Sequence, residues 1–270
     1  MTSRLKPLID PGKVTLTDAD ALPSNGLPKG DEADKALADI RRRIEELQLV
    51  LGAEGRRSLL VVLQGRDTSG KDGVIKKVFG DLNPMYCQVT SFKRPTPLEL
   101  RHDFLWRAHQ AVPPAGMIGV FNRSHYEDVL VVRVHDLVPE QLWRKRYQHI
   151  NDFERMLVDH GVTILKFALH ISKEEQRQRL EDRLADDQKN WKFEAGDLKE
   201  RGVWDEYTAA YQDMLERTST EWAPWYLVPG DKKTARDLLI GKVVVETIEQ
   251  MAPQYPKADP EVLRYRGKIT

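Results

Sequence analysis

A run of apolar residues, a loop bracketed by glycines and an amphipathic segment follow one another in the first third of the chain. The apolar run is Leu59 to Leu63, and the loop after it reads GRDTSGKDG from Gly65 to Gly73. Beyond the loop, Val74 and Val78 are four residues apart, which is the spacing of one helix face. Glycines let successive backbone N–H groups point at an anion, and a helix start adds partial positive charge. The order strand, loop, helix therefore predicts a binding site for phosphate groups.

The string Gly-x4-Gly-Lys inside this loop is weak evidence alone, but its position after a buried strand makes it specific. Lys71 would supply a mobile cation to the phosphates. The alternative interpretation is a glycine turn with a solvated lysine. The loop residues that we expect at the phosphates are Gly65, Thr68, Ser69, Gly70, Lys71 and Asp72.

The loop departs from the usual pattern at Asp72, which stands where a serine or threonine hydroxyl normally ligates magnesium. Another oxygen must then hold the ion. Asp67 is the natural candidate, because a carboxylate among phosphate-binding amides is repelled by the substrate unless a divalent cation lies between them. We expect Asp67 to bind Mg²⁺, with Mn²⁺ as the alternative ion, or to position the acceptor. The competing interpretation is an aspartate that only braces the loop.

Five short segments rich in β-branched or aromatic residues are separated by enough helical sequence for crossover connections. Near-continuous apolar strands that alternate with helices indicate a parallel sheet covered on both faces. We therefore predict an α/β fold, a three-layer α/β/α sandwich around a five-stranded parallel sheet. The predicted strands are Leu59 to Leu63, Gln88 to Phe92, Met117 to Phe121, Thr163 to Leu169 and Trp225 to Val228.

The rest of the chain is divided by composition. Residues 1–30 mix prolines, glycines and charges without a period, so we expect an irregular extension that lies over the body or is partly disordered. Residues 31–270 form the predicted catalytic domain, with a helical lid at about 172–207. From Asp31 a helix is expected, whose apolar face packs on the core or on another subunit of a homo-oligomer.

Charge and cysteine content limit the partners and the compartment. Lys and Arg total 42 and Asp and Glu total 42, so no global field favours nucleic acid or an anionic membrane. A site for a polyanion must then be a local concentration of charge. Cys87 is the single cysteine, which suits a reducing compartment, and we expect a cytoplasmic protein.

A second polar cluster follows the third predicted strand, from Asn122 to Val129. The carboxyl ends of central strands face the ligand crevice in sheets of this type, so the cluster should lie opposite the phosphate loop. Arg123 can neutralise charge on a transferring phosphoryl group, and Asp128 or Glu127 can complete a magnesium site with Asp67. The alternative is an arginine–carboxylate pair that caps the next helix.

A basic segment begins at Ser172, whose side chain is placed to cap a helix with Glu175 three residues on. Basic side chains recur on this helix and in the next loop, and they could close over phosphates. The alternative is a solvated helix, because acidic residues are interleaved with the basic ones. The candidate phosphate ligands are Arg177, Arg183, Lys189 and Lys192 in this segment, with Arg183 favoured, and Lys93 and Arg94 in the loop after the second strand.

These motifs together resemble the polyphosphate kinase 2 family over the stretch from about Leu47 to Met251. The strings that carry the resemblance are GRDTSGKDG (65–73), SFKRPTPLE (91–99), FNRSHYEDV (121–129), SKEEQRQRL (172–180), NWKF (190–193) and APWY (223–226). The wording FNRSHYEDV looks like the subgroup that accepts both nucleoside monophosphates and diphosphates.

The resemblance implies a P-loop kinase core with a helical lid and a magnesium-dependent, reversible transfer of phosphoryl groups from polyphosphate to AMP or ADP, with ATP and other nucleotides as further ligands. It also implies that Asp67, Lys71, Arg123, Asp128 and Arg183 are the functional residues. The competing hypotheses are an ATP-driven kinase of a nucleotide or other small molecule, and a nucleotide-sensing module without turnover.

Overall fold

Five parallel strands form the centre of the molecule in a computed structural model that describes residues 4–9 and 11–268. Their order in the sheet is β2-β3-β1-β4-β5, which confirms the predicted five-stranded parallel sheet. The strand that precedes the glycine loop is central and fully buried, as expected for a continuous apolar run. The strands are β1 (Ser58–Gly65), β2 (Cys87–Ser91), β3 (Ile118–Asn122), β4 (Val162–His170) and β5 (Trp225–Pro229).

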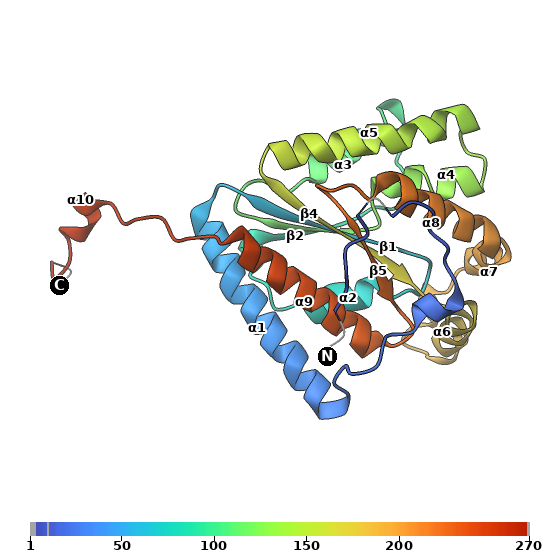
Figure 1. Cartoon of the computed structure of the whole chain (residues 1–270), viewed down its shortest axis with the longest axis horizontal. Helices are drawn as coiled ribbons and strands as arrows, with labels where there is room; N and C mark the ends of the chain where they lie inside the picture. The colour runs from blue at the N-terminus through green and yellow to red at the C-terminus, as the bar shows by residue number, and fades with distance from the viewer. Residues whose placement is uncertain (1–3, 10, 269–270) are drawn as a thin grey trace.

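Helices cover both faces of this sheet, which confirms the three-layer α/β/α architecture (Figure 1). One face carries α1 (Gly30–Glu54), α2 (Lys71–Val78) and α9 (Lys233–Met251). The other carries α3 (Trp106–Ala111), α4 (Val131–Val134), α5 (Glu140–Asp159) and α8 (Trp204–Thr218).

The apolar face that the sequence predicts for the first helix packs within the same chain. Its buried residues include Ile44, Leu47 and Leu51, which belong to the core between α1, α2, α9 and the sheet. The helix ends at Gly55 with φ +63, a left-handed conformation that favours glycine. The same core contains residues of α9, so α1 packs against α9 within this chain.

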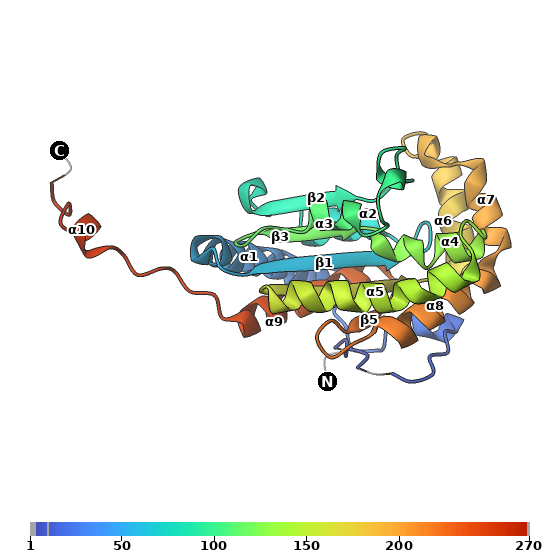
Figure 2. The ribbon, with the colours of Figure 1, turned by 90° about the horizontal axis from the view of Figure 1, so that it is seen from above.

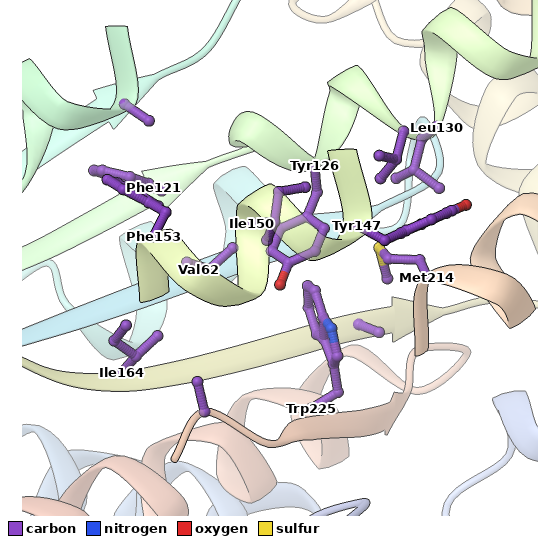
Figure 3. Packing of buried hydrophobic residues seen from close by; sticks show 14 of the residues in the cluster. Val62, Phe121, Tyr126, Leu130, Tyr147, Ile150, Phe153, Ile164, Met214 and Trp225 are labelled. Carbon is purple, nitrogen blue, oxygen red and sulfur yellow. The ribbon is translucent and has the colours of Figure 1, made fainter. Parts of the chain in front are cut away.

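The core on the opposite face contains a buried polar network. Tyr126 points toward Trp225 of β5, and their ring centroids are 4.8 Å apart (Figure 3). The ammonium of Lys166 is completely buried and donates to Glu154 at 2.6 Å, to the Tyr126 hydroxyl at 2.8 Å and to the carbonyl of Thr218 at 2.7 Å. Each buried charge is thereby paired and hydrogen-bonded, which offsets the cost of its desolvation.

The segment before α1 lies across the edge of the sheet. Leu8 forms an isolated antiparallel bridge to Trp225, and Leu16 is buried in the core. The 3₁₀ turn η1 (Asp18–Ala21) follows, and the backbone N–H of Asp231 donates to the carbonyl of Ala21. The described part of the N-terminal extension therefore covers the edge strand β5, which would otherwise expose unpaired backbone groups.

The chain after α9 leaves the body. Residues 254–268 are exposed, and the short helix α10 (Pro260–Leu263) stands well apart from the sheet in both views (Figures 1 and 2). Within residues 4–9 and 11–268, no helix is both long and apolar enough to cross a bilayer.

Three further elements stand at the end of the sheet in the region predicted as a lid (Figure 2). They are α6 (Lys173–Ala185), the 3₁₀ turn η5 (Asn190–Lys192) and α7 (Ala195–Gly202). The Ser172 hydroxyl accepts a hydrogen bond from the backbone N–H of Glu175, as the predicted helix cap requires. The Glu175 carboxylate pairs with Arg179 instead of completing a capping box.

Candidate active site

A cleft of about 810 Å³ opens where the glycine loop, the ends of β2 and β3 and the α6–α7 region meet. The residues that line this wide cleft come from segments far apart in the sequence. They are Asp67, Thr68, Gly70, Lys71, Asp72, Ser91, Phe92, Lys93, Asn122, Arg123, Arg179, Asp182, Arg183, Asp186, Lys189, Trp191, Lys192, Glu194 and Lys233.

The glycine loop has little room for a side chain at Gly65 or at Gly70. A Cβ at Gly65 would lie 2.7 Å from the carbonyl oxygen of Leu169, and Gly70 has φ +97. Thr68 also adopts a positive φ of +63, although it is not glycine, and such backbone conformations concentrate at functional sites. α2 starts at Lys71, within the last part of the GRDTSGKDG string, and its first two residues line the cleft.

Lys71 is almost completely buried at the base of the cleft. Its ammonium donates to the carbonyl of Gly65 at 2.7 Å and to that of Arg66 at 3.1 Å. Desolvation, with a further contribution from the nearby Arg123, lowers the pKa of Lys71 to about 8. A phosphate anion in the cleft would favour the charged form again, because opposite charge stabilises the ammonium.

Arg123 links the two acidic motifs that the sequence predicts to face each other. Its guanidinium is ion-paired with Asp67, and it also pairs with Glu127 at 3.1 Å. These carboxylates raise the pKa of Arg123 above its ordinary value, Glu127 most strongly. Arg123 has φ +60, and its backbone N–H donates to the carbonyl of Leu63 at 3.0 Å. The structure thus brings Asp67, Arg123 and Glu127 together.

Asp67, Arg123 and Glu127 also border a second, narrow cavity of about 20 Å³. Asp67 and Arg123 line both the narrow cavity and the wide cleft. The wall of the narrow cavity includes Tyr207 and Tyr211 of α8 together with Glu127. Asp67 and Arg123 therefore separate the wide cleft from a cavity that is large enough for about one water molecule.

The sequence predicts that Asp128 shares a magnesium site with Asp67, but the structure directs its side chain toward two arginines. One carboxylate oxygen accepts from Arg146 at 2.9 Å, and the other lies 3.7 Å from Arg107. The side chain is not among the residues that line the two cavities, and burial raises the pKa of Asp128. The 3₁₀ turn η4 (His125–Asp128) causes this difference, because it turns Glu127 toward Arg123 and Asp128 toward Arg146 of α5.

The basic residues of the lid divide into two groups. Arg183, Lys189 and Lys192 line the wide cleft, as does Lys93 after β2. Two predicted phosphate ligands lie outside its lining. Arg177 pairs with Glu174 and Glu181 on the exposed side of α6, and Arg94 is exposed in its loop. For Arg177 the competing interpretation, a solvated salt-bridged helix face, describes the structure.

Two buried arginines contact the loop but are not among the site residues that the sequence predicts. Arg179 of α6 and Arg236 of α9 both donate to backbone carbonyls of the glycine loop. The sequence contained a sign that Arg179 is buried. It lies on the same helix face as Leu180, an apolar residue that is expected to pack on the core. No pattern near Arg236 distinguished it from a surface residue.

Strand β1, the glycine loop and α2, with a buried lysine and an arginine between carboxylates, define a P-loop kinase-like phosphotransferase. The model of the Polyphosphate kinase 2 (PPK2) family matches residues 28–256, and the chain belongs to this family.

Individual relatives agree with this assignment. The chain is 56% identical over 225 residues to the AMP/ADP-polyphosphate phosphotransferase of Meiothermus ruber, covering 83% of this chain and 84% of the relative. It is 45% identical over 243 residues to the ADP-polyphosphate phosphotransferase of Rhodopseudomonas palustris, covering 84% of each chain. The crystal structure of Polyphosphate Kinase 2 from Arthrobacter aurescens superposes with a TM-score of 0.89 at 40% identity and covers 99% of both chains.

Proposed function

We propose that this chain transfers phosphoryl groups from inorganic polyphosphate to AMP and to ADP, reversibly, and so forms ADP and ATP. Membership of the PPK2 family supports the reaction class. The acceptor range is supported by the relative from Meiothermus ruber, whose name includes both AMP and ADP.

The observation that carries the proposal is the wide cleft beside the glycine loop, which Asp67, Lys71 and Arg123 all line. The cleft is bordered by Lys93, Arg183, Lys189 and Lys192, which suits a long polyanion better than a compact donor. Phosphoryl transfer needs the two reacting phosphates in line, with positive charge beside the group in transit. Arg123, which lines the cleft beside Asp67, would supply that charge.

Asp67 fits a divalent cation. Its carboxylate is 30% exposed and lines both cavities. Among the residues that the structure describes, no three His, Cys, Asp or Glu side chains form a ready-made metal site. Mg²⁺ is commonly bound through one or two carboxylates plus phosphate oxygens and water, so Asp67, with Glu127 nearby, would suffice. When bound, such an ion neutralises charge on the phosphates.

The protein's own groups position the reaction and stabilise its charge. An oxygen of the acceptor's terminal phosphate forms the new P–O bond to the last phosphorus of the polyphosphate. The bridging P–O bond of the donor breaks, and the shortened chain leaves with its electron pair. The acceptor is already an oxyanion, so no general base is needed. Lys71, Arg123 and Arg183 stabilise the negative charge that is spread over the transferring group.

One assay tests this function. The protein is incubated with magnesium, long-chain polyphosphate and either AMP or ADP, and the nucleotides are separated by chromatography. We expect ADP and ATP from AMP, and ATP from ADP. Reactions without polyphosphate, and reactions with the Asp67→Asn variant, are the controls. If no pairing yields a phosphorylated nucleotide while ATP drives turnover of another acceptor, the chain is an ATP-dependent kinase.

The assembly and the compartment belong to the proposal as well. The single cysteine supports a reducing compartment, and we propose that the protein acts in the cytoplasm as a homo-oligomer. Sedimentation or light scattering at two protein concentrations measures the oligomeric state directly.

A further inference from the structure

The backbone carbonyls of the glycine loop need donors of their own. A loop that turns its N–H groups toward phosphates directs its carbonyl oxygens away from them, and buried carbonyls without partners are costly. In this protein Arg179 and Arg236 supply those donors from outside the loop.

All five N–H groups of Arg179 have acceptors. Its Nε donates to Glu175 at 2.8 Å. Its Nη1 donates to the loop carbonyls of Thr68 at 2.9 Å and Ser69 at 3.3 Å. Its Nη2 donates to the carbonyls of Gly230 at 2.6 Å and Asp231 at 3.3 Å, after β5. A guanidinium has five such donors, so Arg179 has none left for a phosphate, although it lines the wide cleft.

Arg236 approaches the same loop from α9. It is 2% exposed, and its Nη1 donates to the carbonyl of Ser69 at 3.1 Å. Asp237 holds the other side of the guanidinium through hydrogen bonds of 2.9 and 2.7 Å. A Cβ at Gly70 would collide with this guanidinium, and one at Gly73 would lie 3.1 Å from its Nη2. Both loop glycines thus leave the space that Arg236 occupies.

We propose that Arg179 and Arg236 form a carbonyl clamp, a pair of buried positioning residues that fixes the conformation in which the glycine loop binds phosphate. The two arginines come from different helices and converge on the carbonyl of Ser69, so they hold the loop between α6 and α9. The proposal rests on the proposed function only in naming a polyphosphate chain as the ligand of that loop.

The clamp differs from a simple source of positive charge. Lysine would keep the charge, but a compact ammonium cannot reach carbonyls spread around a planar guanidinium. We therefore expect Arg179→Lys and Arg236→Lys to remain impaired. If either variant binds phosphate as tightly as the unaltered protein, charge alone explains the residue and the clamp is wrong.

The test measures binding of tripolyphosphate by calorimetry to the full-length protein. We expect Arg179→Ala and Arg236→Ala to bind about tenfold more weakly or worse, because a charged hydrogen-bond donor to the loop is lost. Gln178→Ala is the matched control, since Gln178 is exposed on the same helix and its side-chain amide donates to Asp182, not to the loop. Binding at the unaltered affinity in both alanine variants would overturn the clamp.

Chemical rescue separates positioning from a general loss of structure. Guanidinium ion at millimolar concentration can enter the space left by Arg236→Ala or Arg179→Ala and should restore part of the binding and of kcat. A merely unfolded variant would not respond, and failure of rescue in a variant with native circular dichroism contradicts the clamp. Binding of tripolyphosphate needs no turnover, so an inactive but binding unaltered protein would count against the proposed function alone.

Discussion

Thr68 and Arg123 are the two residues of the site whose backbone is strained. Both have a backbone φ near +60, which residues other than glycine rarely adopt, and both line the wide cleft. At Arg123 the conformation aims the guanidinium at Asp67 and Glu127. The hydrogen bond from its backbone N–H to Leu63 fixes this turn on the central strand.

Asp67→Asn tests the role of the carboxylate. The amide keeps the size of the side chain but loses the charge that a divalent cation and Arg123 require. We expect kcat/KM for phosphoryl transfer to fall by a factor of about 100 or more, with little change in the thermal unfolding midpoint. Near-normal turnover in this variant would rule out Asp67 as a metal ligand.

The pH dependence of the reaction should report Lys71. Its pKa of about 8 lies below the ordinary value for lysine, so the free enzyme loses this positive charge as the pH rises through 8. We expect kcat/KM to fall by up to about tenfold per pH unit above that point, while kcat falls only at higher pH because bound phosphates stabilise the ammonium.

The comparison variant for this profile is Lys71→Arg. A guanidinium stays charged over the whole accessible range, so its lower activity should show no break near pH 8. A profile for the unaltered protein that stays flat up to about pH 10 would contradict the assignment.

At the scale of elements, side chains from the first two turns of α6 join the predicted lid to the glycine loop. Arg179 and Gln176 of this helix both donate to loop carbonyls, and Arg66 of the loop lies 3.7 Å from the Trp204 ring at the start of α8. Arg183 is one turn further along the same helix, whereas Lys189 and Lys192 follow the end of α6.

Strand β4 and helix α5 are joined by the buried pair of Lys166 and Glu154. Lys166→Met should lower the free energy of unfolding by about 3–5 kcal/mol, because it leaves the Glu154 charge buried without its partner. The double variant Lys166→Met/Glu154→Leu removes both charges and should be more stable than the single one. Urea unfolding monitored by circular dichroism measures both, and equal or greater destabilisation in the double variant would contradict this account.

At the scale of the whole molecule, the described residues near the two ends of the chain differ in how they pack on the body. The described part of the N-terminal segment packs on the body, with Leu16 in the core, whereas residues 254–268 are exposed. Leu16→Ala should cost about 2 kcal/mol or more of unfolding free energy. Removing residues 257–270 should leave that free energy unchanged, and a substantial loss would show that this tail is part of the cooperative unit.

Much of this architecture follows from short stretches of sequence. The five strands were predicted within about two residues at each end, because buried parallel strands are continuous apolar runs between turn residues. The position of the glycine loop between strand and helix is predictable from its glycines, although distant arginines also contact its carbonyls. The cap at Ser172 is equally local.

Other features depend on which distant segments meet, and only the tertiary structure decided them. Adjacent residues Glu127 and Asp128 differ in role because η4 directs one to Arg123 and the other to Arg146 of α5. Arg177 and Arg179, two residues apart, face solvent and the loop because α6 packs on one side only. Arg236 donates to the carbonyl of Ser69, which is 167 residues away in the sequence. Local patterns carry no information about such pairings, since burial and partners are fixed by the packing of helices on the sheet.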